Sequence, residues 1–482
     1  MDLSSLKKLT RDEILCGSFG IERETLRVHS IGELSLTPHP EIFGDKLKNP
    51  IVTTDFSESQ IEIISPTFDN IDEAFITFCS LSDMVNEALP ENEYFWFHSL
   101  PCTLPEEERI PIAHYGYDEE GRKSEEYRIK LAKKYGLKKQ MISGIHFNFS
   151  FADETLKKLY SHDKNQTFDE FKNEVYLKIS RNYIRYCWLV IYLTGSSISC
   201  HNTFTDDCIS LMDKKDKYGS YYSTKGASLR NGSCGYKNLK KLYPSYNSVE
   251  EFTGDVSSYI ESGDLSEAKE LYTQIRLKPK NPKDLLNSLT DTGIEYVEIR
   301  TLDINPFYRC GLTKRDMQFL HLFIIYMLVK NESDYENWQE EALINEELSA
   351  ERAFDDEMRL IKDGEEITLK EWGLELITEM HYMVDELGIY YHDMLDLMTL
   401  RLENPHVTYS KRLCDLIEKQ GYINTITDLS LKNKHKNKNT KINEMKKYRK
   451  LALISKSNYS WSYNDQYNVL ILHQLNLRQL LI

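Results

Sequence analysis

Residues 144–150 read GIHFNFS, a stretch in which polar and apolar side chains alternate. Successive side chains of a β-strand point to opposite faces, so His146, Asn148 and Ser150 share one face of the predicted strand. The other face presents one isoleucine and two phenylalanines. This pattern predicts a strand that lies between a hydrophobic core and a polar site.

Three more segments carry functional groups two positions apart. They are residues 19–26 (FGIERETL), 54–65 (TDFSESQIEIIS) and 296–302 (YVEIRTL). The polar face of the first segment presents Glu22 and Glu24. That of the second presents Glu58, Gln60 and Glu62, with Asp55 at the strand entry. That of the third presents Glu298 and Arg300. Each segment alone is also consistent with a half-exposed strand that has a solvated face.

The four polar faces together have an unusual composition for solvated strands. They hold carboxylates, an imidazole, amides and a guanidinium, where a solvated face usually mixes Lys, Thr, Ser and Glu. Mg²⁺ prefers oxygen ligands and shares them between carboxylates and substrate phosphates. A neutral imidazole can complete such a site, and an arginine can neutralise a phosphoryl group in transfer. The combination indicates a site for phosphoryl transfer with several metal ions.

Helical spacing of apolar residues separates the predicted strands. It predicts helices over residues 71–90, 166–195, 314–330 and 336–361. A Thr-x-x-Glu capping box at residues 368–371 predicts the start of another helix. The chain therefore contains both strands and long helices.

The composition limits the classes of function. The 482 residues are 40% hydrophobic and 28% charged, which is typical of a globular protein. The formal net charge of −16 argues against nucleic-acid binding by the main body. Nine cysteines without a C-x-x-C pair are expected to be reduced thiols of a cytoplasmic protein. No apolar run is long enough to span a bilayer, so we expect neither a nucleic-acid nor a membrane partner.

The composition changes after residue 425. Residues 431–450 hold eight Lys and one Arg against one Glu. We expect one catalytic domain over residues 1–425 and a basic linker or tail over residues 426–482. The alternative is a nucleic-acid or membrane-surface patch, against which the lack of interleaved aromatic residues argues.

The sequence resembles the bacterial glutamate–cysteine ligases, including the ligase half of the bifunctional glutathione-synthesising fusions. The matching stretches occur in family order over residues 19 to about 310. They are FGIERETLRV, TTDFSESQIEIISP, WFHSLPC, YRIKLAKKYG, QMISGIHFNFS, SLRNGSCGY and GIEYVEIRTLDINPF. The resemblance implies an α+β fold, in which a curved antiparallel sheet carries the active site and helices pack outside it, as in the catalytic part of glutamine synthetase.

The resemblance also implies roles for individual residues. The expected ligands of the Mg²⁺ ions, with Mn²⁺ as a possible substitute, are Glu22, Glu24, Glu62, His146 and Glu298. Arg300 is expected to act with Glu298 in catalysis, on the transferring phosphate. Asp55 is expected to be a polar orienting residue near these ligands, and Arg128 and Arg230 are expected to hold substrate carboxylates or phosphates. The expected pocket for cysteine consists of Phe56, Tyr127, Leu131, Gln140, Tyr236 and Tyr272. Without the motifs, each of these tyrosines would be interpreted as a core or rim aromatic, and Arg128 as part of a solvated helix face.

The activity implied is ATP-dependent ligation of the γ-carboxylate of L-glutamate to the amine of L-cysteine, through a γ-glutamyl phosphate. Two alternatives stay open: ligation to a different amine, and an inactive, shortened remnant of a bifunctional fusion. Neither Gly-rich phosphate-binding motif is found, and the chain is too short to hold the ATP-grasp domain of the fusions as well. The sequence does not indicate the oligomeric state.

Overall fold

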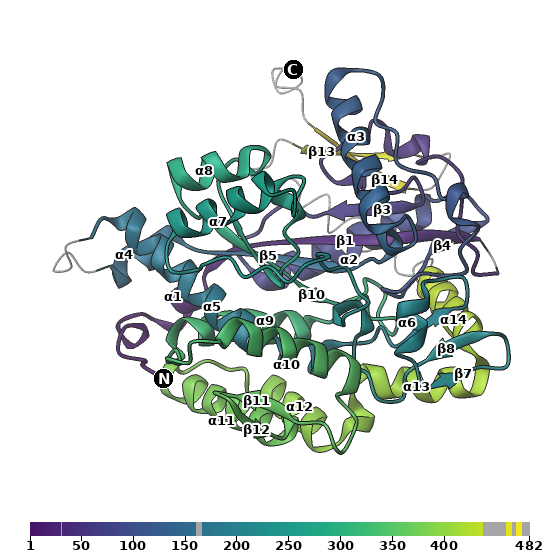
Figure 1. Ribbon diagram of the computed structural model, residues 1–482. Helices are drawn as coiled ribbons and strands as arrows, with labels where there is room; N and C mark the ends of the chain where they lie inside the picture. The colour runs from purple at the N-terminus through teal and green to yellow at the C-terminus, as the bar shows by residue number, and fades with distance from the viewer. Residues whose placement is uncertain (30, 161–165, 437–458, 465–468, 475–482) are drawn as a thin grey trace.

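The computed structural model describes residues 1–29, 31–160, 166–436, 459–464 and 469–474. A seven-stranded sheet, in which all pairs are antiparallel, lies at its centre (Figure 1). Its strands are β1 (Gly17–His29), β2 (Val52–Thr54), β3 (Gln60–Ile64), β4 (Glu93–Phe95), β5 (Ile145–Phe151), β9 (Ile275–Lys278) and β10 (Tyr296–Leu302). They are ordered β2-β3-β1-β5-β10-β9, and β4 pairs with β1. The expected α+β class with an antiparallel sheet is confirmed.

The apolar face of the sheet is closed by long helices. Phe19 and Phe149 are fully buried on this face and contact the ring of His321. The helices that pack against the sheet are α2 (Ile71–Ala88), α5 (Phe168–Thr194) and α9 (Lys314–Val329). The second half of α5 and most of α9 are buried all round, because other helices cover their outer sides.

Further helices surround this core. They are α1 (Arg11–Ile14), α3 (Glu119–Tyr135), α4 (Asp153–Leu159), α6 (Asp206–Ser210), α7 (Val249–Glu261), α8 (Leu285–Thr292), α10 (Trp338–Arg352), α11 (Leu369–Leu387), α12 (His392–Glu403), α13 (Tyr409–Gln420) and α14 (Tyr422–Lys436). Short strands form three small sheets: β6 (Ser199–His201), β8 (Ser220–Tyr222) and β7 (Lys214–Lys215); β11 (Leu360–Lys362) and β12 (Glu365–Ile367); and β13 (Tyr459–Asn464) and β14 (Val469–Gln474). In Figure 1, α10, α11 and α12 lie together below the central sheet, and α3 projects above it.

Most predicted helices agree with the structure to within a few residues. The capping box at Thr368 starts α11 as expected. The helix predicted over residues 336–361 was too long, because α10 ends at Arg352 and β11 follows. Asn345 explains the difference: its side chain both donates to Ile361 O (2.6 Å) and accepts from Ile361 N (2.8 Å). A tertiary contact therefore stabilises an extended segment where local spacing favours a helix.

The boundary expected at residue 425 lies inside α14. Tyr422 and Ile426 of this helix are fully buried. Ser430 Oγ accepts a hydrogen bond from Phe97 N (3.1 Å), and Asn433 Nδ2 donates to Pro306 O (3.0 Å). The packed body therefore continues to at least Asn433. Most of the basic stretch lies outside the described residues.

The cysteines differ from the expectation of nine thiols. Cys79 is joined to Cys310, and Cys208 to Cys234, by disulfide bonds. These partners are 231 and 26 residues apart along the chain, so only the tertiary structure brings them together. The other five cysteines are free thiols, of which four are buried.

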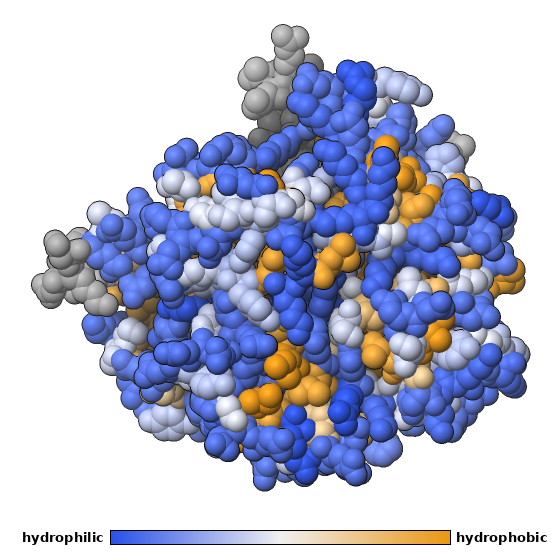
Figure 2. All heavy atoms as spheres, viewed as in Figure 1, coloured by the Kyte–Doolittle hydropathy of each residue, from blue (hydrophilic) through white to orange (hydrophobic). Residues whose placement is uncertain are grey.

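The surface visible in Figure 2 is mostly hydrophilic, and its hydrophobic side chains gather in small separate patches. Among the described residues, no helix combines the length and the apolar character that a bilayer span requires.

Candidate active site

Strand pairing brings the polar faces of β3, β1, β5 and β10 into one surface. Directly opposite residues of antiparallel strands point to the same side of the sheet. The register places Glu24 opposite Glu62, and Glu22 opposite His146. On the next pair, Glu298 lies opposite Asn148. All five expected metal ligands therefore lie on one face of four adjacent strands.

Direct contacts join the centre of this surface. His146 Nδ1 lies 3.3 Å from Glu22 Oε2, and Asn148 Nδ2 donates to Glu22 Oε1 at 2.9 Å. The other ring nitrogen, His146 Nε2, lies 3.5 Å from Glu24 Oε1 and has no hydrogen-bond partner among the residues that the structure describes. The imidazole therefore stands between two carboxylates that come from one strand.

The carboxylates of β1 and β3 repel one another. Burial raises the pKa of Glu24 to about 8, with the charge of Asp55 adding to the effect. Burial, together with Asp55, Glu22 and Glu24, raises the pKa of Glu62 well above its ordinary value. Burial also lowers the pKa of His146 to about 4, so its imidazole is neutral at pH 7. This end of the surface therefore has an excess of buried acidic groups with too few cations to balance them.

Glu298 has the opposite environment. Burial alone would raise its pKa, but Lys278, Arg300 and Arg276 together hold the pKa well below its ordinary value. Arg300 NH1 donates to Glu298 Oε1 at 2.8 Å, Lys278 Nζ contacts Glu298 Oε2, and Arg276 NH1 lies 3.7 Å from Oε1. Arg276 and Lys278 belong to the edge strand β9 and were missed in the sequence analysis. Their spacing of two residues in the segment IRLK is the same signal that identified the other strands.

The donor set fits hard divalent cations. It offers four carboxylates and a neutral imidazole with one unpartnered buried nitrogen, which are ligands that Mg²⁺ or Mn²⁺ accepts. Bound cations would also remove the mutual repulsion of Glu22, Glu24 and Glu62. In the part of the chain that the structure describes, no three acidic, His or Cys side chains surround one point closely enough to hold an ion. Side-chain movements would therefore accompany metal binding.

Arg230 lies beside the acidic end of the surface. Gly144 leaves the space that its guanidinium fills: a Cβ on Gly144 would lie 2.1 Å from Arg230 NH2. The backbone of Arg230 is held by Ser197, whose Oγ accepts from Arg230 N at 3.2 Å. Ser197 is held in turn by the buried Asp303. Among the described residues no side-chain hydrogen bond engages this guanidinium, which leaves it able to receive an anionic group.

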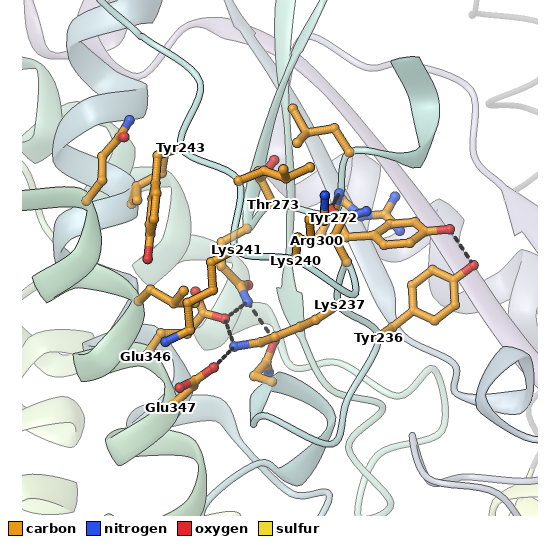
Figure 3. A pocket seen from close by; sticks show the side chains of 18 of the residues that line it. Tyr236, Lys237, Lys240, Lys241, Tyr243, Tyr272, Thr273, Arg300, Glu346 and Glu347 are labelled. Atoms are coloured by element: carbon orange, nitrogen blue, oxygen red, sulfur yellow. Dashed lines mark hydrogen bonds and ion pairs between the residues drawn. The ribbon is translucent and has the colours of Figure 1, made fainter. Parts of the chain in front are cut away.

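The expected cysteine pocket forms a continuous hydrogen-bonded group. Tyr272 OH donates to Tyr236 OH (2.9 Å), and Tyr236 OH donates to Gln140 Oε1 (2.6 Å), as Figure 3 shows for the two tyrosines. Phe56 and Leu131 are buried hydrophobic neighbours of the same cluster, in which Tyr127 is partly buried. The segments that contribute these residues are α3 and the stretches around residues 140, 236 and 272. The structure therefore brings the expected pocket residues together.

Arg128 does not lie on the solvated helix face that its sequence context suggests. Its Nε donates to Asp55 O at 2.5 Å, NH1 donates to Ser124 O at 2.8 Å, and its guanidinium lies over the ring of Tyr115. These contacts hold α3 against the loop that carries Asp55. Burial raises the pKa of Asp55, although Arg128 and Arg300 oppose the shift.

A second hydrogen-bonded cluster supports the aromatic pocket from behind. Glu270 is fully buried; its side chain accepts from Tyr135 OH (2.5 Å) and Ser266 N (2.6 Å) and contacts Lys134 Nζ. Asn238 Oδ1 accepts from Tyr272 N (2.9 Å), and its Nδ2 donates to Glu270 O (2.8 Å). This cluster ties the end of α3 to the segment that carries Tyr272. No motif in the sequence analysis indicated it.

A cavity of about 390 Å³ opens beside the aromatic pocket (Figure 3). Figure 3 shows Tyr236, Tyr272 and Arg300 on one side of it, and Arg230, α10 and the segment 237–246 also contribute to its lining. Lys237 pairs there with Glu346 (3.0 Å) and Glu347 (3.3 Å). The cavity therefore joins the aromatic pocket to Arg300.

Glu58, which the alternation grouped with Glu62, does not join the site. Its carboxylate accepts from His39 N (2.6 Å) and His114 N (2.7 Å) and pairs with Lys46 (2.5 Å). The reason is that β3 begins at Gln60, so the alternation does not extend back to Glu58.

Comparison with known proteins agrees with this arrangement. The family model described as glutamate-cysteine ligase matches residues 3–266 and 260–350. The chain is 40% identical over 433 residues to the glutathione biosynthesis bifunctional protein GshAB of Clostridium perfringens, covering 87% of this chain and 55% of that protein. It is 34% identical over 439 residues to a glutamate–cysteine ligase of Clostridium acetobutylicum, covering 83% of this chain and 91% of that protein. The chain thus spans about half the length of its bifunctional relative and nearly all of the monofunctional one.

Solved structures show the same likeness. The glutamate–cysteine ligase of Francisella tularensis, crystallised in complex with AMP, superposes with a TM-score of 0.79 at 28% identity, covering 88% of this chain and 89% of that one. A bifunctional glutathione synthetase from Pasteurella multocida gives a TM-score of 0.77 at 27% identity, covering 88% of this chain and 53% of that one. Sequence motifs, sheet topology and these matches agree, and the chain belongs to the glutamate–cysteine ligase family.

Proposed function

We propose that this chain forms γ-glutamylcysteine, ADP and phosphate from L-glutamate, L-cysteine and ATP, the first step of glutathione biosynthesis. The observation that carries the proposal is the juxtaposition of two sites. A face of carboxylates with Arg300 lies next to the aromatic pocket, because Tyr236 and Tyr272 line one cavity together with Arg300. The first suits phosphoryl transfer, and the second suits a small amino acid.

The reaction has two steps. In the first, an oxygen of the glutamate γ-carboxylate attacks the γ-phosphorus of ATP, ADP leaves, and a γ-glutamyl phosphate forms. In the second, the cysteine nitrogen attacks the γ-carbonyl carbon, the bond from that carbon to the phosphate oxygen breaks, and the departing phosphate takes up the amine proton. Arg300, already 2.8 Å from Glu298, donates to the phosphoryl oxygens in both steps. Arg230 receives a carboxylate of the glutamate substrate.

Divalent ions fit the same surface. Glu22, Glu24, Glu62, His146 and Glu298 would hold Mg²⁺, or Mn²⁺ in its place. When bound, the ions neutralise the charge that develops on the phosphoryl group. ATP is the co-substrate, and the AMP complex of the Francisella relative supports nucleotide use.

The aromatic pocket accounts for the choice of amine. A small side chain packs against Tyr236 and Tyr272, whose hydroxyl groups are hydrogen-bonded to each other at 2.9 Å. Phe56 and Leu131 close the apolar side. Such a pocket discriminates between side chains of similar shape by only about 1–3 kcal/mol. We therefore expect 2-aminobutyrate to be accepted with a loss of about 10- to 100-fold in kcat/KM.

The test is phosphate release from the purified chain with ATP, Mg²⁺ and L-glutamate, with and without L-cysteine, and identification of the product by mass. Cysteine-dependent release with a γ-glutamylcysteine product supports the proposal. Release that depends on another amine of a panel would identify a different γ-glutamyl ligase. No release from folded protein would indicate an inactive remnant.

The proposed partners are small molecules only: L-glutamate, L-cysteine and ATP. We propose the cytoplasm as the location, because ATP and free cysteine are available there. We assign no nucleic-acid or membrane partner to the acidic body.

A further inference from the structure

The cations on β9 have no role in the function proposed so far. Lys278 and Arg276 point to the polar face of the sheet, because they lie opposite Tyr296 and Glu298 of β10. Lys278 Nζ contacts Glu298 Oε2, and the two side chains are 17% and 2% exposed. A lysine thus contacts one oxygen of a proposed metal ligand.

The sheet has two distinguishable ends on either side of Glu298. Arg300 and Tyr272 lie towards one end, with the aromatic pocket and Arg230. Lys278 and Tyr296 pair at the other end, where β9 finishes and β10 begins. In the proposed function the amino acids occupy the first end, which leaves the second end for the nucleotide. Lys278 therefore lies on the side from which the polyphosphate arrives.

Arg276 and Lys278 differ in what else holds them. Arg276 NH2 donates to Lys269 O (2.7 Å) and Nε donates to Leu271 O (3.3 Å), so this guanidinium fixes the segment before β9. Among the described residues, Glu298 is the only side chain within ion-pair distance of Lys278 Nζ. Lys278 can therefore change partner without loss of a structural contact, whereas Arg276 cannot.

We propose that Lys278 neutralises Glu298 while the metal site is empty and moves onto the polyphosphate of the nucleotide when a divalent ion binds Glu298. The proposal rests on the proposed function, because it requires a nucleoside triphosphate as substrate. An ammonium group and a divalent ion compete for one carboxylate, since both are positive and would lie only a few ångströms apart. The polyphosphate brings negative charge that Lys278 binds through charge-assisted hydrogen bonds.

The test uses Lys278→Met in the full chain and two binding measurements that need no turnover. The first is Mn²⁺ affinity without nucleotide, from the electron paramagnetic resonance signal of free Mn²⁺. The variant is expected to bind Mn²⁺ about fivefold more tightly, because a competing cation has been removed. The second is calorimetric binding of AMPPNP and of AMP with Mg²⁺. The variant is expected to bind AMPPNP at least about 10-fold more weakly, with less than about a twofold change for AMP.

Two further variants separate this role from a general loss of positive charge or of structure. Lys283→Met removes a lysine that is 82% exposed and pairs with Glu120, and it should leave both affinities unchanged. Lys278→Arg keeps the charge and should retain most of the AMPPNP affinity. Unchanged or weaker Mn²⁺ binding by Lys278→Met, or equal losses for AMPPNP and AMP, would overturn the proposal.

Failure of the proposed function gives a different result. A wild-type chain that binds Mn²⁺ and AMPPNP but makes no γ-glutamylcysteine would refute the ligase activity and leave the Lys278 comparison intact. A wild-type chain that binds neither Mn²⁺ nor AMPPNP would refute both.

Discussion

Replacing Gly144 by alanine tests whether the position of the Arg230 guanidinium limits glutamate binding. A Cβ on Gly144 would lie 2.1 Å from NH2, 2.4 Å from CZ and 2.6 Å from Nε of Arg230. Ordinary carbon contacts begin near 3.4 Å, so the guanidinium has to move by more than about 1 Å. Gly144 does not have a positive φ, so its backbone accepts alanine. The substitution therefore displaces one functional group without removing a charge.

The expected loss follows from that displacement. A misplacement of about 1 Å in a positioning group lowers the rate about 100-fold, equivalent to about 2.7 kcal/mol of transition-state stabilisation. We expect kcat/KM for glutamate to fall by about this factor, as measured by coupled ADP release at saturating ATP and cysteine. Gly254→Ala is the matched control, because its Cβ would meet no atom within 4 Å on an exposed turn of α7. The control should leave kcat/KM unchanged.

A double-mutant cycle shows whether the loss acts through Arg230. Arg230→Ala removes the group that Gly144→Ala displaces, so the double variant should be no worse than Arg230→Ala alone. Additive losses would mean that Gly144 acts through another neighbour, such as Glu24, whose backbone N–H donates to Gly144 O (3.0 Å). Wild-type kinetics in Gly144→Ala would refute the reasoning directly.

Three further predictions concern other parts of the molecule. Glu298→Gln is expected to lower kcat at least about 100-fold with an unchanged circular dichroism spectrum. The control is Glu295→Gln, which changes a partly exposed carboxylate that pairs with Lys172. Equal activity of the two variants would contradict the placement of the site. Glu270→Gln weakens the support of Tyr272. It should raise KM for cysteine about 10-fold, while KM for glutamate changes little. Parallel changes in both Michaelis constants would argue against a role of Glu270 in the pocket. Burial lowers the pKa of His321 to about 3. Below pH 6.5 the unfolded chain therefore binds a proton at this histidine that the folded chain does not bind. The free energy of unfolding falls as the pH falls through this range. His321→Phe should therefore reduce the fall in unfolding free energy between pH 6 and pH 4 by up to about 1.4 kcal/mol per pH unit, measured by urea denaturation, and identical slopes in both proteins would refute the assignment.

Alternation along the chain predicted the four strands that carry the expected metal ligands, although not β9. Period-two patterns place Glu22 with Glu24, and Glu298 with Arg300, on one face whatever their neighbours are. Capping signals are equally local, as at Thr368, whose side chain accepts from Glu371 N within one helical turn. The family motifs then allowed the pocket residues to be named in advance, and the structure brings those residues together.

Interactions between distant segments required the tertiary structure. Lys278 lies 20 residues before Glu298, and its importance appears only when β9 pairs with β10 in the observed register. Glu270 is linked to Tyr272 through Asn238, and its side chain is held by Tyr135 at the end of α3, which lies 135 residues away in sequence. Glu58 illustrates the opposite case, since a predicted alternation stops where β3 begins and the side chain turns to Lys46 and His39 instead.

The sequence by itself therefore determined which side chains share a face, because strand and helix periodicity depends on local backbone geometry. It also determined the family, through long motifs in a constant order. Strand register and packing decided which of those faces meet, and with them the raised pKa of Glu24, the lowered pKa of Glu298 and the lysine beside that carboxylate. The physical reason is that burial and charge depend on distances between segments far apart in the chain, which local preferences do not specify.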